Sequence, residues 1–332
     1  MMTVSVALAT YNGEKYISEQ LDSLLLQTRQ PDEVIIIDDC STDKTAEMVR
    51  EYILSHDVNW RFEAADKNSG YIKNFRACLE KCTGDVIFLC DQDDVWYSEK
   101  IETIMSVFEN DTECAAVNSS FDTIDGNGKA LSLSVSGKRG TANHGLIKFS
   151  VENGACVPIG LETLLVYNVS PGCTCAFKAS VVKEYLNSAE SVMPHDWALN
   201  IIAARQSGLR FLNLPLIGYR QHGNNTIGLS SDSSFGPLHM RGTADGRLKI
   251  YELQKAQCDM ARAEHDRHNK RQRKFCHAFE RFCNNRQRIL YSKRLFPCFK
   301  NFVLYPSLRK VATVHFRGLL GDIVFVLKSK KL

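Results

Sequence analysis

The chain has 332 residues, of which 44% are hydrophobic and 24% are charged. This composition supplies enough apolar side chains for a sizeable core and excludes an intrinsically disordered protein. The formal net charge is only +3, but 21 Lys and Arg stand against 7 Asp and Glu from Asp245 onward. The body of the chain is therefore acidic, and its C-terminal part is strongly basic.

The sequence carries no recognisable export or membrane-spanning signal. Residues 1–8 lead directly into an apolar run without a basic leader, and no apolar run reaches the roughly 20 residues that span a bilayer. We therefore expect a cytoplasmic protein that does not cross the membrane. The 12 cysteines are scattered singly and lack zinc-knuckle spacing, which favours reduced thiols.

Short apolar runs alternate with amphipathic stretches over the first part of the chain. The runs, rich in β-branched residues, cover residues 4–9, 33–37, 60–65, 86–90 and 115–118. The stretches between them have helical spacing, marked by Ile17, Leu21, Leu24 and Leu25 and then by Ala46, Val49, Tyr52 and Ile53. This alternation predicts an α/β fold with a mostly parallel, doubly wound sheet of the Rossmann-like type.

The middle of the chain is less regular. Residues 126–160 lose clear periodicity and gather Gly, Ser and Lys, so we predict a loop there and assign it no structure. Residues 164–168 and 173–177 are again predicted to be ordered. A helix is predicted over 197–206, and a strand near 216–220.

The basic C-terminal part has a helical pattern. Residues 245–294 are predicted to be continuously helical until Pro297 and Pro306 break the helix. We therefore predict a first domain over residues 1–240 and a helical, basic extension over residues 241–332.

Polar side chains follow three of the predicted strands at the point where each strand ends. These side chains are Thr10 and Asn12, then Asp38 and Asp39, then Asp91, Asp93 and Asp94. Open α/β sheets bind ligands at the carboxyl edge of their strands. The sequence therefore predicts that these groups converge on one edge of the sheet.

The cluster of Asp91, Asp93 and Asp94 predicts a metal site. Neighbouring carboxylates repel one another unless they share a cation, and their hard oxygen atoms suit Mg²⁺ or Mn²⁺. The alternative is a solvated acidic turn that caps a helix starting near Ser98.

The turn that begins at Asp38 and Asp39 predicts nucleotide binding. A carboxylate there can accept hydrogen bonds from a base N–H or from ribose hydroxyls, while Thr10 and Asn12 hold the base edge. Helix capping is the alternative role of this turn, and both roles are compatible.

Two later motifs contain residues typical of catalysis. Asp196, between His195 and Trp197, can act as a general base, although an aspartate at the start of a helix is ordinarily a cap. Arg220 and His222 can contact phosphates, or His222 can bind a metal. A structural role is the alternative for both.

Taken together, these motifs resemble the family-2 glycosyltransferases over roughly residues 1–225. The segments that carry the resemblance are 8–13, 37–43, 91–96, 195–197 and 219–225. The string Asp-Gln-Asp-Asp-Val-Trp, which contains a DxD motif, and the later His-Asp-Trp look most like the bacterial rhamnosyltransferase-like branch. The resemblance implies a GT-A fold, with the catalytic domain at residues 1–240.

The resemblance implies a direct, inverting displacement at the anomeric carbon of a nucleotide-sugar donor, with Mn²⁺ or Mg²⁺ as cofactor. It assigns Asp196 as the catalytic base. We assign donor-nucleotide binding to Thr10, Asn12, Asp38, Asp39 and Asp91, metal binding to Asp93, Asp94 and His222, and acceptor or phosphate contacts to His195, Trp197 and Arg220. Cys40 departs from the family, which usually has a glycine there, so the geometry of this turn is open.

The expected donor is TDP-rhamnose, with UDP-hexoses and UDP-hexosamines as alternatives. We expect a saccharide or lipid-linked acceptor in bacterial surface polysaccharide synthesis and no nucleic-acid partner. The basic extension predicts peripheral association with the inner face of the plasma membrane. The apolar residues assigned to that contact are Phe299, Phe302, Val303, Leu304, Tyr305, Leu319, Leu320, Ile323, Val324 and Phe325. A solvated basic face, or an intramolecular partner for the acidic body, is the alternative.

Two hypotheses from other functional classes of protein remain open. A haloacid-dehalogenase-type phosphatase would use Asp91 as nucleophile, but no convincing downstream Lys and acidic pair follow it. A catalytically inactive nucleotide-sugar-binding component is the second, against which the intact Asp93, Asp94 and Asp196 argue.

Overall fold

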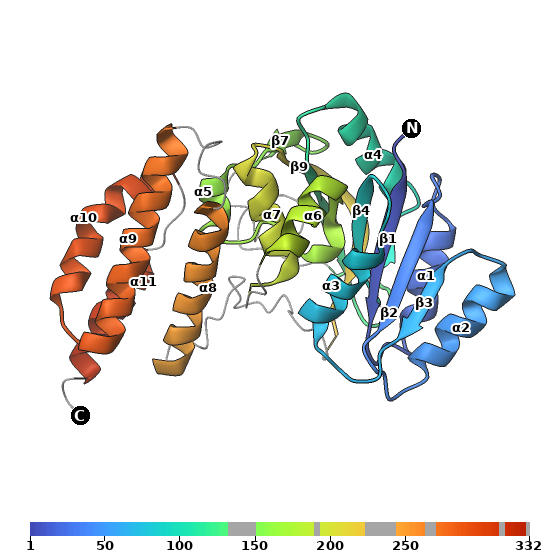
Figure 1. Cartoon of the computed structure of the whole chain (residues 1–332), viewed down its shortest axis with the longest axis horizontal. Coiled ribbons are helices and arrows are strands. Elements are labelled where there is room, and N and C mark those ends of the chain that lie inside the picture. The colour runs from blue at the N-terminus through green and yellow to red at the C-terminus, as the bar shows by residue number, and fades with distance from the viewer. Residues whose placement is uncertain (132–150, 189–192, 223–243, 263–269, 312–315, 330–332) are drawn as a thin grey trace.

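A nine-stranded sheet forms the centre of the computed structural model (Figure 1). The structure describes all residues except 132–150, 189–192, 223–243, 263–269, 312–315 and 330–332. The strands are β1 Val4–Thr10, β2 Glu33–Asp38, β3 Arg61–Ala64, β4 Val86–Asp91, β5 Val95–Trp96, β6 Ala116–Ile124, β7 Cys156–Pro158, β8 Cys175–Lys178 and β9 Leu209–Arg220. They are ordered β3-β2-β1-β4-β8-β6-β9-β5, with β7 on β9.

The sheet is parallel through most of its strands, as the sequence predicts. β1 runs parallel to β2 and β4, β2 to β3, and β6 to β9. β8 is antiparallel to both of its neighbours, β4 and β6, and β5 and β7 are antiparallel to β9. The predicted α/β class is confirmed. The local sequence pattern did not predict the antiparallel strands β5, β7 and β8.

Helices cover both faces of the sheet because alternate residues of a strand point to opposite sides. In β1, Val6 and Leu8 belong to one hydrophobic cluster, and Ala7 and Ala9 belong to the other. The first cluster is covered by α1 Ile17–Leu25, α2 Thr45–His56 and α4 Lys100–Asn110. The second is covered by α3 Tyr71–Lys81, α6 Ala179–Asn187 and α7 His195–Arg205 (Figure 1).

The predicted loop over residues 126–160 contains one short strand, β7, in its described part. The strand pairs with β9, and the helix α5 Leu161–Leu164 and the 3₁₀ helix η2 Gly172–Thr174 follow it. Residues 132–150 lie outside the described residues. A strand of three residues is too short to show a period of two in the sequence, so it was not predicted.

Four helices form the described part of the C-terminal extension: α8 Ala244–Arg262, α9 Lys270–Ser292, α10 Phe296–Val311 and α11 Phe316–Ser329. The predicted break at Pro306 is wrong, because Pro306 lies inside α10. Pro297 is the second residue of α10, where the missing proline N–H has no intrahelical partner to lose. The predicted domain boundary at residue 240 falls outside the described residues. None of the described helices combines the length and apolarity needed to cross a bilayer.

The extension shares a hydrophobic core with the body of the chain. Phe275, Phe279 and Phe282 of α9 repeat at helical spacing and belong to the same buried cluster as residues of α5 and α7. Arg205, at the end of α7, donates from Nη1 to the carbonyl oxygen of Met260 at 2.8 Å and pairs with Glu184. The extension is therefore packed onto the α/β body.

We expect Phe279→Ala to lower the free energy of unfolding of the whole chain by about 3–5 kcal/mol, because the ring is only 2% exposed in the shared core. Phe299→Ala is the matched control: this ring is 65% exposed, and the change should stay within about 0.5 kcal/mol. Urea unfolding followed by circular dichroism measures both. A loss confined to a separate, minor transition would contradict the shared core.

Candidate active site

The loops after β1 and β2 meet at the carboxyl edge of the sheet. Thr10 Oγ1 donates to Asp38 Oδ1 at 2.9 Å, and the N–H of Ser41 donates to Asp38 Oδ2 at 2.8 Å. The N–H of Asn12 donates to Ser41 Oγ at 2.8 Å, and its Oδ1 accepts from the N–H of Thr42 at 2.8 Å. These residues therefore lie together as predicted, and their polar groups join the two loops.

Asp39 fixes a third segment, the start of α3. Its carboxylate accepts from the N–H and hydroxyl of Ser69 at 2.8 and 2.9 Å and from the N–H of Gly70 at 2.8 Å. Cys40, the departure from the family pattern, has a φ of 62°, so a non-glycine residue occupies the left-handed region here. The carboxylates of Asp38 and Asp39 are both engaged by the protein, and their contact with a nucleotide remains a prediction.

The side chain of Gln92 connects the acidic turn to the loop after β1 through hydrogen bonds. This role was not predicted from the sequence. Its amide exchanges two hydrogen bonds with the backbone of Tyr11, at 2.7 and 2.8 Å. A β carbon at Gly13 would lie 2.3 Å from Gln92 Oε1, so a larger residue there would displace the Gln92 amide. The position of Gln92 inside the Asp-Gln-Asp-Asp string was the available signal.

The acidic turn after β4 brings Asp91, Asp94 and Cys173 together, with ligand atoms all within 4.8 Å of one another. Asp94 Oδ1 accepts from the N–H of Arg220 at 2.9 Å, while its buried Oδ2 has no hydrogen-bond partner. Burial, and next the charge of Asp93, raises the pKa of Asp91 to about 7 and that of Asp94 well above its usual range. The turn therefore holds protons at neutral pH or requires a positive charge.

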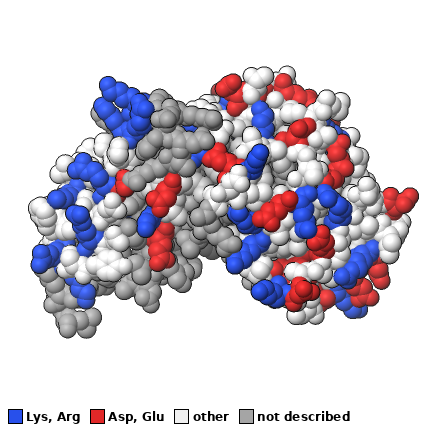
Figure 2. All heavy atoms as spheres, in the orientation of Figure 1, with Lys and Arg blue, Asp and Glu red and all other residues white. Residues whose placement is uncertain are grey.

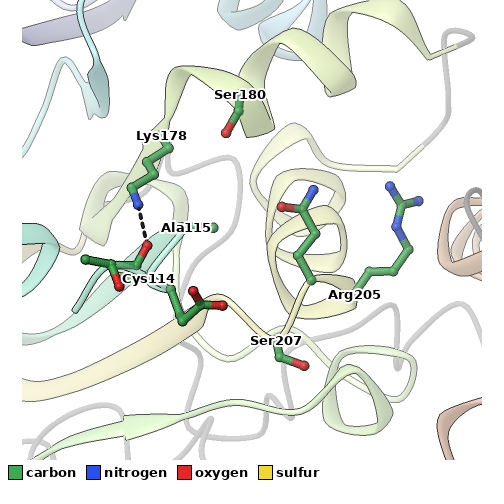
Figure 3. A pocket seen from close by; sticks show the side chains of 9 residues that line it. Cys114, Ala115, Lys178, Ser180, Arg205 and Ser207 are labelled. Carbon is green, nitrogen blue, oxygen red and sulfur yellow. Dashed lines mark hydrogen bonds between the residues drawn. The ribbon is translucent and has the colours of Figure 1, made fainter. Parts of the chain in front are cut away.

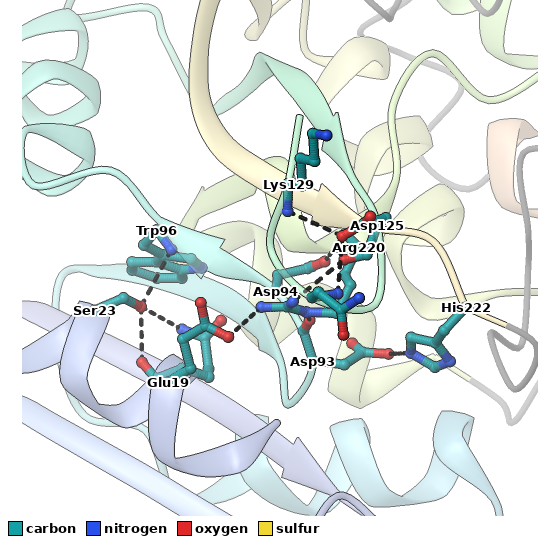
Figure 4. A network of polar contacts seen from close by, with 11 residues as sticks. Glu19, Ser23, Asp93, Asp94, Trp96, Asp125, Lys129, Arg220 and His222 are labelled. Atoms are coloured by element: carbon teal, nitrogen blue, oxygen red, sulfur yellow. Dashed lines mark hydrogen bonds and ion pairs between the residues drawn. The ribbon is translucent and has the colours of Figure 1, made fainter. Parts of the chain in front are cut away.

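Asp93 points to a different partner from Asp94. Its Oδ2 lies 2.7 Å from His222 Nε2, and the imidazole stacks on Tyr16 with ring centroids 4.8 Å apart. Figure 4 shows this pair beside Asp94 and Arg220. The predicted metal ligands are neighbours, but the tightest group of ligand atoms among the described residues replaces Asp93 and His222 with Asp91 and Cys173.

Arg220, at the end of β9, is buried, and all three nitrogen atoms of its guanidinium donate hydrogen bonds (Figure 4). Its guanidinium donates to the carbonyl oxygen of Asp93 at 2.7 Å, to that of Asp125 at 3.3 Å and to Glu19 Oε2 at 2.5 Å. It also lies over the ring of Tyr16. These contacts make Arg220 a support of the acidic turn, and its predicted phosphate contact has no counterpart in them.

Lys100 lies under the acidic turn and was missed by the sequence analysis. It is fully buried, its Nζ donates to the carbonyl oxygen of Cys173 at 2.6 Å, and the ammonium lies 3.6 Å from the centroid of the Trp96 ring. Burial lowers the pKa of Lys100 to about 8. A lysine in the first turn of a helix reads as solvated, so no local signal identifies it.

Asp196 lies in the first turn of α7 on the same side as the acidic turn. Its charge raises the pKa of Asp91, although burial and Asp93 contribute more. Burial raises the pKa of Asp196 itself to about 6, while hydrogen bonds from the N–H of Trp197 and from the Asn168 amide lower it. Gly172 allows the close approach, since a β carbon there would lie 3.3 Å from Asp196 Cβ.

The two neighbours of Asp196 have apolar surroundings. His195 stacks on Phe75 with centroids 4.1 Å apart, neither ring nitrogen has a hydrogen-bond partner, and burial lowers the pKa of His195 to about 3. Trp197 Nε1 donates to the carbonyl oxygen of Leu164 at 2.7 Å and so joins α7 to α5. Neither residue makes a polar contact toward the acidic turn, and their assignment as acceptor contacts remains a prediction.

A separate pocket of about 330 Å³ lies at the opposite edge of the sheet (Figure 3). Its lining includes Cys114 and Ala115 before β6, Lys178 at the end of β8, and Arg205 and Ser207 before β9. β6 and β9 begin here, whereas the acidic turn follows the end of β4, which runs in the same direction. None of the predicted site residues lines this pocket.

Comparisons with known proteins agree with this arrangement. Residues 5–160 match the family model described as "Glycosyl transferase family 2". The chain is 28% identical over 235 residues to the dTDP-rhamnosyl transferase RfbG of Shigella flexneri, which covers 67% of this chain and 73% of that protein. It is 36% identical over 105 residues, 31% of this chain and 18% of that protein, to the poly(ribitol-phosphate) beta-N-acetylglucosaminyltransferase TarS of Staphylococcus aureus.

The structure of S. aureus TarS residues 1–349 in complex with UDP-GlcNAc has the same fold. It superposes with a TM-score of 0.54 and 18% identity, over 93% of this chain and 91% of that one. The DxD-containing turn lies at the carboxyl edge of the sheet, in the residues that match the family model. Residues 5–160 therefore match glycosyltransferase family 2, and the chain has the GT-A fold.

Proposed function

We propose that the chain is an inverting, metal-dependent glycosyltransferase in which Asp196 is the catalytic base. The observation that carries this proposal is that Asp196 lies against Gly172, the residue before Cys173, whose Sγ is within 4.8 Å of carboxylate oxygens of Asp91 and Asp94. In the proposed step, Asp196 takes the proton of an acceptor hydroxyl as its oxygen attacks the anomeric carbon. The nucleoside diphosphate leaves from the opposite face of the sugar.

The acidic turn fits a divalent cation. The buried Asp94 Oδ2 has no hydrogen-bond partner, and carboxylates this close repel one another without a counter-ion. We propose that Asp93, Asp94 and His222 hold Mn²⁺ or Mg²⁺ and that Asp91 contacts the donor nucleotide. When bound, the cation would supply positive charge beside the leaving diphosphate.

The donor proposed first is TDP-rhamnose, supported by the likeness to a dTDP-rhamnosyl transferase over two thirds of the chain. UDP-N-acetylglucosamine is the alternative, supported by the likeness to TarS. We propose a saccharide or lipid-linked acceptor in the synthesis of a bacterial cell-surface polysaccharide. Within the family match, the phosphatase alternative for Asp91 has no support.

A panel of UDP-, TDP- and GDP-sugars with Mn²⁺ or Mg²⁺ tests the class and the donor. We expect nucleotide release from one donor only, dependent on the metal and lost in Asp93→Asn/Asp94→Asn, because the variant removes two carboxylate charges from the turn. Asp57→Asn is the control, since Asp57 follows α2 with a left-handed φ of 51° that asparagine also tolerates. Donor binding without release under any condition would favour the inactive binding component.

Mn²⁺ titration calorimetry locates the metal ligands. If Asp93, Asp94 and His222 hold the ion, we expect His222→Ala to weaken Mn²⁺ binding about 10- to 100-fold, while Cys173→Ser leaves it unchanged. The opposite pattern would move the metal to the group formed by Asp91, Asp94 and Cys173.

The rate of transfer should rise with pH through about 6, because the base must be ionised and burial raises the pKa of Asp196 to about 6. Below that pH the carboxyl is protonated and cannot accept the proton. Asp196→Asn should lower kcat about 10²- to 10⁴-fold while donor affinity persists. Stopped assays over a pH series, with donor affinity from calorimetry, measure both. Full activity in Asp196→Asn would remove Asp196 as the base.

We also propose that α10 and α11 contact an anionic membrane surface. Their exposed apolar residues repeat every three or four positions, as Phe296, Phe299 and Val303 on α10 and as Leu320, Val324 and Leu327 on α11. On the face in Figure 2, Lys and Arg outnumber Asp and Glu over the C-terminal helices. Exposed Lys293, Arg294, Lys300 and Arg309 flank the stripe.

The structure narrows the apolar set expected from the sequence. Phe302, Leu304 and Tyr305 pack partly against the shared core, and Ile323 packs against a smaller cluster beside it. The side chains of Leu319 and Phe325 lie outside the described residues.

Phe296→Ser/Phe299→Ser/Val303→Ser should weaken binding to vesicles with anionic lipid about tenfold or more, because it removes the exposed apolar stripe from α10. Leu54→Ser is the control: Leu54 is 82% exposed on α2, in the α/β body. Co-sedimentation with anionic and with neutral vesicles measures the effect. Unchanged sedimentation of the triple variant, and of a chain ending at Arg294, would exclude this surface.

A further inference from the structure

Three asparagine side chains, the buried Asn118 and Asn200 and the half-buried Asn168, form a continuous hydrogen-bonded chain that ends on Asp196. Asn118, on β6, and Asn200, on α7, exchange two hydrogen bonds between their amides at 2.9 and 3.0 Å. Asn200 Nδ2 also donates to Asn168 Oδ1 at 3.3 Å, and Asn168 Nδ2 donates to Asp196 Oδ2 at 2.8 Å. Neither the general-base assignment nor the metal assignment uses these residues.

The direction of this chain is fixed by a backbone group. Asn168 Oδ1 accepts from the N–H of Val169 at 3.0 Å, and a backbone N–H can only donate. The oxygen of Asn168 must therefore face Val169 and Asn200, which leaves its NH₂ group to face Asp196. Asn200 satisfies both of its N–H bonds, one to Asn118 and one to Asn168. Each amide is thus held in one orientation by its neighbours.

We propose that Asn168, supported by Asn200 and Asn118, is the positioning residue of the catalytic base. Its amide holds Oδ2 of Asp196, so that the acceptor hydroxyl proton passes to Oδ1 as the O–H bond breaks. The acceptor oxygen then bonds to the anomeric carbon as the bond from that carbon to the leaving diphosphate oxygen breaks. This inference rests on the proposed role of Asp196. An amide suits the task because it donates a hydrogen bond to the ionised carboxylate at every pH and never titrates itself.

The surroundings of Asp196 explain why such a donor matters. The titratable groups that face it from the neighbouring elements are Asp91 of β4, Tyr71 of α3 and Cys175 of β8, with His195 beside it on α7. Burial favours the protonated form of Asp196. Hydrogen bonds from the Asn168 amide and from the first backbone N–H groups of α7 offset this effect by stabilising the ionised form. Among the described residues, no Lys or Arg contributes to the pKa of Asp196, and the amide of Asn168 is the side chain that favours its ionised form.

The test is the pH profile of transfer, measured with whichever of TDP-rhamnose or UDP-N-acetylglucosamine the wild-type protein consumes. In Asn168→Ala the acidic limb should move up by about one to two pH units, because the ionised base loses a charge-assisted hydrogen bond. The rate should fall about 3- to 25-fold at pH 6.5 and approach the wild-type rate near pH 9. Asn168→Asp, which keeps the side-chain shape, should move the limb further in the same direction, since two adjacent carboxyls then share a proton.

Two further variants separate positioning from folding. Asn200→Ala should move the limb in the same direction by a smaller amount, because Asn168 then loses one of its two supports. Asn213→Ala is the control: Asn213 is a buried asparagine on β9 that donates to Val151 and Glu152, and its loss should reduce stability without moving the limb. Unchanged limbs in Asn168→Ala and Asn168→Asp, or a loss of rate equal at all pH values, would overturn the proposal.

The same assays distinguish this inference from the function on which it rests. If Asp196→Asn abolishes transfer while the limb stays in place in the Asn168 variants, Asp196 is the base and the amide chain is structural. If Asp196→Asn remains fully active, Asp196 is not the base, and the proposed role of Asn168 falls with that assignment. A moved limb in Asn168→Ala but not in Asn200→Ala would restrict the positioning role to Asn168.

Discussion

Repulsion among the carboxylates at the end of β4 is the constraint on which the site depends. The charges of Asp91, Asp93 and Asp94 repel one another, and burial makes the ionisation of Asp91 and Asp94 still less favourable. Arg220, the last residue of β9, stabilises the turn. Its backbone N–H donates to the carboxylate of Asp94, and its guanidinium donates to the carbonyl oxygen of Asp93. Lys100 adds a buried positive charge from below. Arg220 thus reaches the turn from strand β9, and Lys100 reaches it from helix α4.

Local patterns predicted the parts of the fold that local sequence determines. The strands at 4–9, 33–37 and 86–90 and the polar groups at their ends were found because apolar runs and turn residues are visible in short windows. The segment at 173–177 was also marked as ordered, but the antiparallel direction of β8 was not predicted, because it depends on which strands β8 joins. Pro306 likewise reads as a helix breaker, yet the flanking helix is held by packing against α9.

The contacts that complete the site join residues far apart in sequence. Asn118 and Asn200 are separated by 82 positions, and Asp94 and Arg220 by 126. A neutral asparagine or a single lysine carries no periodic signal, so nothing in a window around Lys100 or Asn168 marks it. The motif residues were therefore predictable as a set, but the division of the acidic turn between His222 and its other partners required the three-dimensional arrangement.

The shared core of the extension and the body limits how such an enzyme can be re-engineered. The aromatic rings of α9 fill a cluster to which α5 and α7 also contribute, and α7 carries Asp196. A chimera that exchanged only the C-terminal helices with a relative would mismatch this interior and disturb the helix that carries Asp196. Natural variation in the two regions should consequently be correlated, and a functional hybrid would need its crossover before α5, so that α5, α7 and the C-terminal helices come from one parent.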